Sequence, residues 1–216
     1  MRRREVINGV RFLTFSCYRR LFLLANPRIR DLFAKELTRV REKHRFRLIA
    51  WVVMPNHVHL LIMPRPMVGT ADRATLLASW SNVTDILTDL KGEFGKEVIG
   101  RWKQLRAPIL DSITTSARTP RFWQPGGGFD RNIGDDHVFL QKIAYIHHNP
   151  VKNGLVEREE DWAWSSKRWY LGERDGQVPI DFEWGTWKWT PPAPWIRDAC
   201  EVDMNAVRRG DFSLDQ

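Results

Sequence analysis

Two histidines separated by one residue are the first candidates for chemistry in this sequence. His57 and His59 flank Val58 inside an apolar segment. If the segment is a β-strand, alternate side chains share a face, so both imidazoles point to one side while Val58 packs on the other. Two neutral imidazoles on a rigid strand are suited to hold a divalent metal ion. The pattern alone is also compatible with two surface histidines or two hydrogen-bonded core histidines.

Tyr145 is the candidate nucleophile. It opens the segment YIHHNP near the end of an expected helix, where residues four apart share a face, so Tyr145 and Asn149 point the same way. A phenol with a pKa of about 10 attacks poorly at neutral pH. A metal that polarises a phosphate, or a cation such as Lys142 that favours the phenolate, would overcome this. The alternative is an ordinary half-buried tyrosine.

Hydrophobic periodicity predicts the elements that position these residues. Alternation predicts a strand over Val10 to Cys17, and the apolar runs Leu48 to Met54 and His57 to Met63 predict a central antiparallel hairpin. Helical spacing predicts helices from Pro27, capped by Asn26, to about His44, from about Ala74 to Val98, and from Asp135 or Asp136 to about Asn149. Gly92 and Gly95 weaken the end of the second helix, and Pro150 ends the third. Residues 100–121 are predicted to form a loop, and residues 122–133 a strand or turn.

The order strand, helix, strand, strand, helix, strand predicts an α+β fold. It is the split βαβ pattern of a ferredoxin-like sandwich with an antiparallel sheet, in which helices cover one face. We expect one domain over residues 1–170 and a Trp-rich C-terminal extension over 171–216. Its tryptophans could stack bases, but packing over the sheet is the favoured interpretation. The fold alone names no function.

The charge of the chain favours a polyanionic partner. The 216 residues carry a formal net charge of +8, with a pI near 9.9. Lys and Arg bind nucleic acid because each neutralised phosphate releases counterions, although a solvated basic face or an anionic membrane surface would also fit. We expect DNA contacts from basic residues at both ends of the predicted domain: Arg2, Arg3, Arg4, Arg11, Arg131 and Lys142, with Arg19 and Arg20 as further members of a basic arm.

Other features narrow the class of protein. No run of 18 apolar residues and no export signal is present, and the two cysteines, Cys17 and Cys200, give no disulfide framework. We therefore expect a soluble protein of the reducing cytoplasm that does not enter membranes. The run Gly126 to Gly128 could line a phosphate with backbone amides, or could form a bulged hairpin.

Three motifs in order resemble a known family. They are WVVMPNHVHLLIM (Trp51 to Met63), YIHHNPVKNGLV (Tyr145 to Val156) and DWAWSS (Asp161 to Ser166). Together they resemble the REP-associated tyrosine transposases, which belong to the single-tyrosine transposases of the HUH endonuclease superfamily. The resemblance covers about residues 10 to 170.

The resemblance implies an HUH endonuclease fold and a chemistry for each candidate residue. His57 and His59 match the histidine pair that binds Mg²⁺ or Mn²⁺, and Asn149 matches the polar residue that completes the metal site, with His148 as second choice. Tyr145 matches the nucleophile, which forms a 5′-phosphotyrosine link. The implied substrate is single-stranded or hairpin DNA, possibly palindromic repeats, cleaved and rejoined in DNA transposition and recombination.

The assembly state and two other functions stay open. The resemblance implies a self-contained monomer, although dimers that exchange the tyrosine helix occur in the wider superfamily. A non-catalytic nucleic-acid-binding module derived from a transposase is the main alternative function. A metal hydrolase with water as nucleophile is the third.

Overall fold

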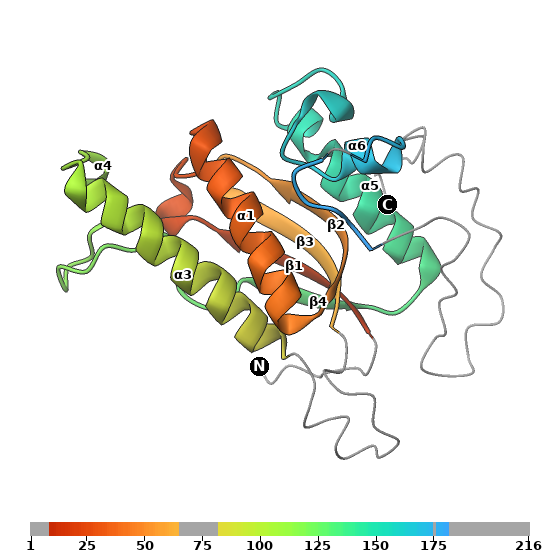
Figure 1. The fold of residues 1–216 in the computed structure, drawn as a ribbon, viewed down its shortest axis with the longest axis horizontal. Coiled ribbons are helices and arrows are strands. Elements are labelled where there is room, and N and C mark those ends of the chain that lie inside the picture. The colour runs from red at the N-terminus through yellow and green to blue at the C-terminus, as the bar shows by residue number, and fades with distance from the viewer. Residues whose placement is uncertain (1–8, 65–81, 175, 182–216) are drawn as a thin grey trace, which may run out of the picture.

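The computed structural model describes residues 9–64, 82–174 and 176–181 (Figure 1). In chain order the elements are β1 (Val10–Ser16), η1 (Tyr18–Arg20), α1 (Pro27–His44), β2 (Arg47–Val53), β3 (His57–Met63), α3 (Val83–Gln104), α4 (Ile109–Ile113), β4 (Phe129–Ile133), α5 (Asp136–Lys152), η2 (Glu159–Asp161) and α6 (Lys167–Tyr170). The four strands form one antiparallel sheet in the order β2-β3-β1-β4. This is the ferredoxin-like arrangement that the sequence predicts.

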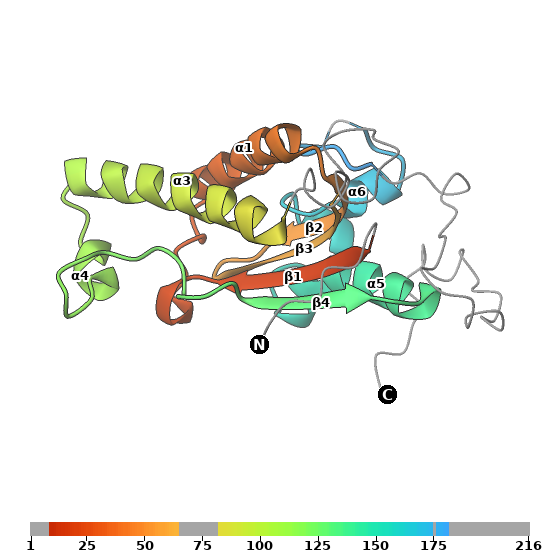
Figure 2. The ribbon, with the colours of Figure 1, turned by 90° about the horizontal axis from the view of Figure 1, so that it is seen from below.

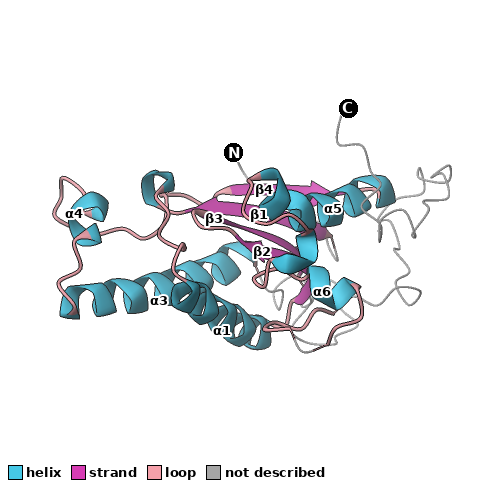
Figure 3. Cartoon of the chain, turned by 90° about the horizontal axis from the view of Figure 1, so that it is seen from above, coloured by secondary structure: helices cyan, strands magenta, loops and turns pink. Residues whose placement is uncertain are grey.

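Helices lie on both faces of the sheet. Figures 2 and 3 show α1 and α3 side by side on one face and α5 on the other, where it packs against β2 and β3. The prediction that helices cover one face was therefore wrong. Its physical cause lies in α5, which buries an apolar stripe that includes Phe139, Ile143 and Ile146. That stripe needs a sheet face of its own, because α1 and α3 already occupy the first.

The first strand and first helix begin and end close to the predicted positions. In β1, alternation sends Leu13 and Phe15 to the α1 side and Phe12 and Thr14 to the α5 side. The side chain of Asn26 caps α1 by accepting a hydrogen bond from the backbone N–H of Arg28 at 2.9 Å. Both expectations for this part of the chain are confirmed.

The hairpin of β2 and β3 forms as predicted, but it is not central, because β2 is an outer strand. The main chain of residues 164–166 covers its outer edge. The N–H of Val53 donates to the carbonyl of Trp164 at 2.9 Å, and the N–H of Ser166 donates to that of Trp51 at 3.0 Å. An outer strand with unpaired backbone groups would invite aggregation, so this covering protects the sheet.

The chain beyond residue 170 continues to pack on this domain. Val178 and Ile180 are buried, and the Asp181 N–H donates to the Leu48 carbonyl at 2.8 Å. The predicted boundary between 170 and 171 stays a prediction. Ahead of this boundary, Trp162 is buried and Trp164 is half-buried, and the Arg30 guanidinium lies over both rings. The packing expected for the tryptophans of the extension stays a prediction. The tryptophans from Trp184 onward lie outside the described residues.

Helix α3 runs further than its glycines suggest. Residues 65–81 lie outside the described part of the chain, so the expected start near Ala74 stays a prediction, and the helix continues through Gly92 and Gly95 to Gln104. The prediction of a loop over residues 100–121 was therefore wrong in two places. Its first residues belong to α3, and α4 lies within it. Burial of Phe94 and stacking of Trp102 on Phe122, with ring centroids 5.6 Å apart, outweigh the cost of about 1 kcal/mol per helical glycine.

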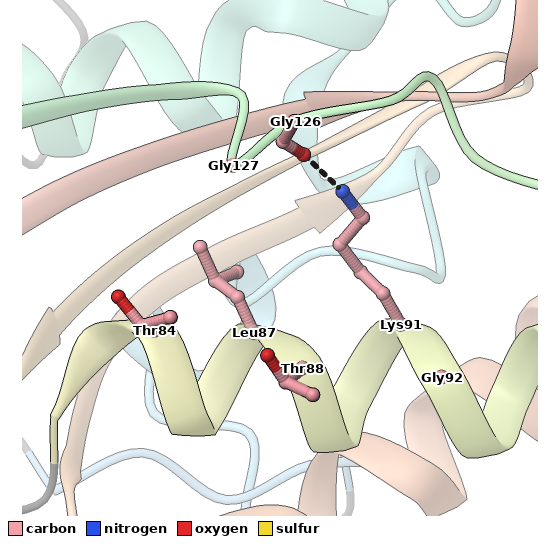
Figure 4. Close-up of a pocket in the computed structure, with 7 residues that line it drawn as sticks. All are labelled: Thr84, Leu87, Thr88, Lys91, Gly92, Gly126 and Gly127. Carbon is pink, nitrogen blue, oxygen red and sulfur yellow. Dashed lines mark hydrogen bonds between the residues drawn. The ribbon is translucent and has the colours of Figure 1, made fainter.

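The run of glycines has a packing role at one position. Gly128 has a φ of +74°, and a Cβ there would collide with the backbone carbonyl of Thr14, so only glycine lets this segment approach β1. Figure 4 shows a groove of about 690 Å³ between α3 and this turn, where the Lys91 ammonium donates to the Gly126 carbonyl at 2.7 Å. The groove lies on the α3 side of the sheet. The expected phosphate contact of these glycines stays a prediction.

Helix α5 begins as predicted and ends later. The side chain of Asp135 caps it by accepting from the Val138 N–H at 2.7 Å. Pro150 was expected to end the helix, yet it lies inside it, and α5 continues to Lys152. Proline so near a C-terminus removes few helical hydrogen bonds, and Gly154, with a φ of +66°, then turns the chain. No helix in the three described ranges is long and apolar enough to cross a bilayer.

Candidate active site

The two histidines of β3 face α5 from the sheet. Antiparallel pairing sets Thr14 opposite His59 and Ser16 opposite His57. His59 is buried, with 4% of its surface exposed, and His57 is half-buried at the start of the strand. Their Nε2 atoms lie 3.1 Å apart. The predicted sharing of one strand face by the two imidazoles is confirmed.

Each imidazole is held by an oxygen on its other ring nitrogen. Nδ1 of His59 lies 2.7 Å from Thr14 Oγ1, and Nδ1 of His57 lies 2.6 Å from Asn56 Oδ1. With the ring protons on Nδ1, both N–H groups donate to these oxygens, and both Nε2 lone pairs point towards each other. Partners of this kind fix the orientation of metal-binding histidines.

Burial keeps both imidazoles neutral. Desolvation is the largest cause that lowers the pKa of His57 to about 4, and the nearby charge of Arg20 also lowers it, while a hydrogen bond with Asn149 raises it. Desolvation lowers the pKa of His59 to about 3, helped by His57 and Lys142. At neutral pH both rings therefore carry no charge, which is the form that binds metal ions.

The geometry of the pair fits a divalent metal ion. Two nitrogen ligands about 2.1 Å from one ion, at roughly a right angle, lie about 3 Å apart. The observed Nε2–Nε2 separation of 3.1 Å matches that spacing. Two lone pairs this close repel each other unless a cation or a proton lies between them. The described residues contain no cluster of three or more His, Cys, Asp or Glu that could hold a metal ion.

Asn149 of α5 is the amide next to this pair. It is buried, with 3% exposed, and its Nδ2 lies 3.3 Å from His59 Nε2. Its Oδ1 accepts a hydrogen bond of 3.1 Å from Nδ2 of Asn153, one turn later. The hydrogen bond by which Asn149 raises the pKa of His57 needs an acceptor, and in this side chain the acceptor is the amide oxygen, so the amide lies next to both histidines. That oxygen is the atom that binds metal ions, and as a ligand it would be shared between the metal and Asn153.

Tyr145 lies over His59 on the same side of the sheet. The two ring centroids are 5.2 Å apart, and Phe12 contacts both rings, at 6.0 Å from Tyr145 and 5.5 Å from His59. The ammonium of Lys142, one turn earlier, lies 5.4 Å from the Tyr145 centroid. A phosphodiester that contacted the histidine pair would therefore be within reach of the phenol and of a cation. The predicted nucleophile, histidines and amide come together from one chain, and their roles stay predictions.

The remaining predicted residues are distributed differently. His148 points away from the pair, with Nδ1 3.3 Å from Glu159 Oε1, so its position favours Asn149 as the third-ligand candidate. Arg131 is exposed on β4, and Arg19 and Arg20 are exposed in η1. Arg2, Arg3 and Arg4 lie outside the described residues.

The prediction that Arg11 contacts DNA was wrong. It is buried, with 4% exposed, and its guanidinium forms a two-pronged ion pair with Asp130 at 2.6 and 2.9 Å. The charge of Arg11 is neutralised by the Asp130 carboxylate of the neighbouring strand, and its side chain is buried. Arg11 is therefore not exposed for contact with DNA. Sequence alone could not reveal this, because the pairing depends on the β1–β4 register.

Sequence reasoning missed four residues around the site. Thr14 and Phe12 share a strand face by alternation, but only the register with β3 brings them to His59. Phe129, which contacts Phe12, lies in a segment whose strand character was ambiguous. Asn153 lies one turn beyond Asn149 and follows a proline, so it fell outside the predicted helix.

Comparisons with known proteins agree with the motifs. Residues 9–84 match the family described as Transposase IS200 like. A REP-associated tyrosine transposase of Escherichia coli (strain K12) is 24% identical over 182 residues, which is 84% of this chain and 88% of that protein. A Haemophilus influenzae protein described as a putative REP-associated tyrosine transposase is 26% identical over 125 residues, or 58% of this chain, and the match spans 61% of that protein.

A solved structure shares the fold. It is that of a REP-associated tyrosine transposase bound to a REP hairpin, with a TM-score of 0.58 and 21% identity, covering 91% of this chain and 98% of the other. At this identity the likeness establishes the fold alone. The family match over residues 9–84, the two relatives and the motifs agree, so the chain is similar to the REP-associated tyrosine transposases.

Proposed function

We propose that this protein is a metal-dependent DNA endonuclease and strand-transferase that uses Tyr145 as its nucleophile. The observation that carries the proposal is the joint position of Tyr145, the two histidines and Asn149 on one face of the sheet. A phenol, a pair of neutral imidazoles and a nearby ammonium are the groups that attack on a phosphodiester requires.

The reaction follows from these groups. The phenol oxygen of Tyr145 forms a bond to the scissile phosphorus, and the bond from phosphorus to the 3′ oxygen breaks. The phenol loses a proton and the departing 3′ oxygen gains one, so the products are a 5′-phosphotyrosine and a free 3′-hydroxyl. Because one ester replaces another, that hydroxyl can reverse the step and rejoin DNA without an external energy source.

The residues around Tyr145 position the reacting groups and neutralise negative charge. His57 and His59, with Asn149 as third candidate, would hold Mg²⁺ or Mn²⁺, which when bound acts as a Lewis acid on a phosphoryl oxygen. Thr14 and Asn56 fix the ring orientations, since each contacts an Nδ1 atom. Lys142 favours the phenolate of Tyr145 by its charge. Phe12 packs against Tyr145 and His59 and keeps their rings in place.

Single-stranded or hairpin DNA is the proposed substrate, and palindromic repeats are the proposed target. The solved relative is described as bound to a REP hairpin, and the net charge of +8 favours a polyanion.

The test is covalent trapping. Purified protein is incubated with end-labelled hairpin DNA and Mn²⁺, and protein-linked DNA is separated under denaturing conditions. The wild-type chain should form an adduct that Tyr145→Phe lacks, because the ring contacts are kept and only the attacking oxygen is lost. Tyr18→Phe is the matched control, since Tyr18 is also half-buried but lies in η1, and it should form the adduct normally.

The other two functions give distinct outcomes. A non-catalytic binding module would bind the hairpin equally well with chelator or with His57→Ala, and would form no adduct. A hydrolase with a water nucleophile would cut the DNA in a metal-dependent way without any protein-linked product. Adduct formation that persists in Tyr145→Phe would remove Tyr145 from the role proposed here.

A further inference from the structure

An exposed aromatic ring lies beside the candidate active site. Phe129 is 55% exposed on β4, an outer strand of the sheet, and its ring is 6.2 Å from that of Phe12 in an edge-to-face contact. Phe12 in turn contacts both His59 and Tyr145. Single exposed apolar side chains are common on protein surfaces, and what distinguishes Phe129 is its contact with a ring of the candidate site.

The register of the sheet fixes where this ring lies. Phe129 pairs with Thr14, and Thr14 pairs with His59, so the three residues form one row across three strands. Neighbouring strands are about 4.8 Å apart, which puts Phe129 roughly 10 Å from His59 along the row. The sugar of one nucleotide can bridge such a span, with its phosphate at the histidines and its base at the ring.

Two cations lie beside Phe12, on which the Phe129 ring packs. Arg131 pairs with Phe12 across the strands and is exposed. It lies two residues after Phe129, so its side chain leaves the same face of β4. The Lys142 ammonium lies 5.3 Å from the Phe12 centroid. Burial, together with the charge of Arg131, lowers the pKa of Lys142, which agrees with two like charges near one another. Aromatic rings beside two cations complement a base and its phosphates, whereas an apolar protein partner would leave both charges without counterions.

We propose that Phe129 stacks on an unpaired base next to the scissile phosphate, and that Arg131 and Lys142 bind the phosphates on either side of that nucleotide. The inference rests on the proposed function and adds to it a residue that seats the single strand. Stacking tolerates any base, because every base has a flat face. Phe129 therefore sets the position of the strand and not its sequence.

Abasic scanning tests this inference. The probe is a fluorescein-labelled DNA hairpin with short single-stranded flanks, and in separate probes each flank nucleotide is replaced by an abasic one. Affinity is measured by anisotropy in EDTA at one fixed salt concentration, so that no cleavage occurs. Phe129→Ala should weaken binding of the intact probe about 5- to 100-fold, and should have no further effect on the probe that is abasic at one particular flank position.

Three variants separate stacking from folding. Phe129→Leu keeps an apolar contact with Phe12 but has no flat π face, so it should lose as much affinity as Phe129→Ala. Phe129→Trp should restore it. Leu105→Ala, which removes another exposed apolar side chain at the far end of α3, should bind as wild type does. Equal weakening on every probe, or wild-type affinity of Phe129→Leu, would overturn the inference.

The outcome is independent of the chemistry. Trapping with Mn²⁺ reports the nucleophile, whereas anisotropy in EDTA reports the stacked base. An adduct without any position-specific effect of Phe129 leaves the proposed function standing and removes the stacking role. A position-specific effect without an adduct keeps Phe129 as a DNA-binding residue and removes the nucleophile.

Discussion

The two faces of the sheet carry different kinds of side chain. On the α1 and α3 side the contacts are almost entirely aromatic and aliphatic. Phe33 is fully buried, 5.2 Å from Phe94 and 5.9 Å from Trp123 by ring centroids, and Phe15 lies 5.0 Å from Trp123. Edge-to-face contacts of this kind add stability beyond the burial of apolar area. This side holds the fold together.

On the α5 side the same strands present polar groups. His59 and Asn149 are as buried as many core residues, yet each has a polar neighbour, Thr14 for His59 and Asn153 for Asn149. Buried polar groups without partners would cost about 1–3 kcal/mol each. The aromatic rings here, Phe12 and Tyr145, pack next to these polar groups, at the border of the apolar core that the stripe of α5 joins.

The difference shows how one sheet can serve two purposes. The α1 and α3 face is held by apolar contacts, whereas the α5 face combines the apolar stripe of α5 with neutral buried histidines and the Tyr145 phenol, which contribute little to stability. Changes on the first face should therefore act mainly on folding, and changes on the second mainly on metal binding and chemistry. Variants on the two faces can break or sharpen this contrast.

The largest expected effect is on the apolar face. Phe33→Ala should lower the free energy of unfolding by about 3–5 kcal/mol, because it creates a cavity among the rings of Phe15, Phe94 and Trp123. Urea denaturation measures the loss. Adduct formation per folded molecule should be unchanged. A loss below about 1 kcal/mol would contradict the assignment of stability to this face.

On the polar face the expected effect is on rate. His57→Ala removes one of two imidazoles and should reduce Mn²⁺-dependent cleavage by about 100-fold or more, since a polarising metal ion contributes several kcal/mol to transition-state stability. Cleavage of labelled DNA and calorimetric titration with Mn²⁺ measure it. Stability should change by no more than about 1 kcal/mol, the worth of one hydrogen bond.

The matched control is His137→Ala. His137 is an exposed histidine of α5, where its Nε2 lies 3.4 Å from the side-chain nitrogen of Gln141. It should cleave DNA at the wild-type rate. Equal rates for His57→Ala and His137→Ala would mean that the histidine pair does not serve the chemistry.

The fold was largely predictable because local signals agreed with it. Alternation gave β1, and the Asn26 and Asp135 caps marked the starts of α1 and α5. The errors arose where tertiary packing outweighs local preference. Phe94 and the stacked pair of Trp102 and Phe122 carry α3 past its glycines. Which sheet face a helix covers is likewise absent from periodicity, and α5 was misplaced for that reason.

The candidate site was predictable only in its motif residues. His57 and His59 share a face by strand period, and Tyr145 and Asn149 share one by helical period, so each pair was visible in the sequence. The meeting of the two pairs, the Thr14 contact and the burial of Arg11 depend on strand register and on helix packing. Those are long-range properties that no local spacing encodes.

The smallest expected effect tests a detail of the polar face, the orientation of the Asn149 amide. Its oxygen accepts from Asn153, and its nitrogen faces His59. As a metal ligand this oxygen would be shared with the Asn153 donor. Asn153→Ala should therefore tighten Mn²⁺ binding about two- to fivefold, because a hydrogen bond of roughly 0.5–1 kcal/mol no longer competes for the oxygen.

Two further variants make the result decisive. Asn153→Asp should tighten binding more, since a carboxylate does not donate to the amide oxygen and adds a negative charge near the metal. In an Asn149→Ala background, Asn153→Ala should have no effect, because the coupling runs through the missing amide. Weaker Mn²⁺ binding in Asn153→Ala, or an effect that survives without Asn149, would show that the amide serves the histidines through its nitrogen and that the third ligand is not a side chain of this helix turn.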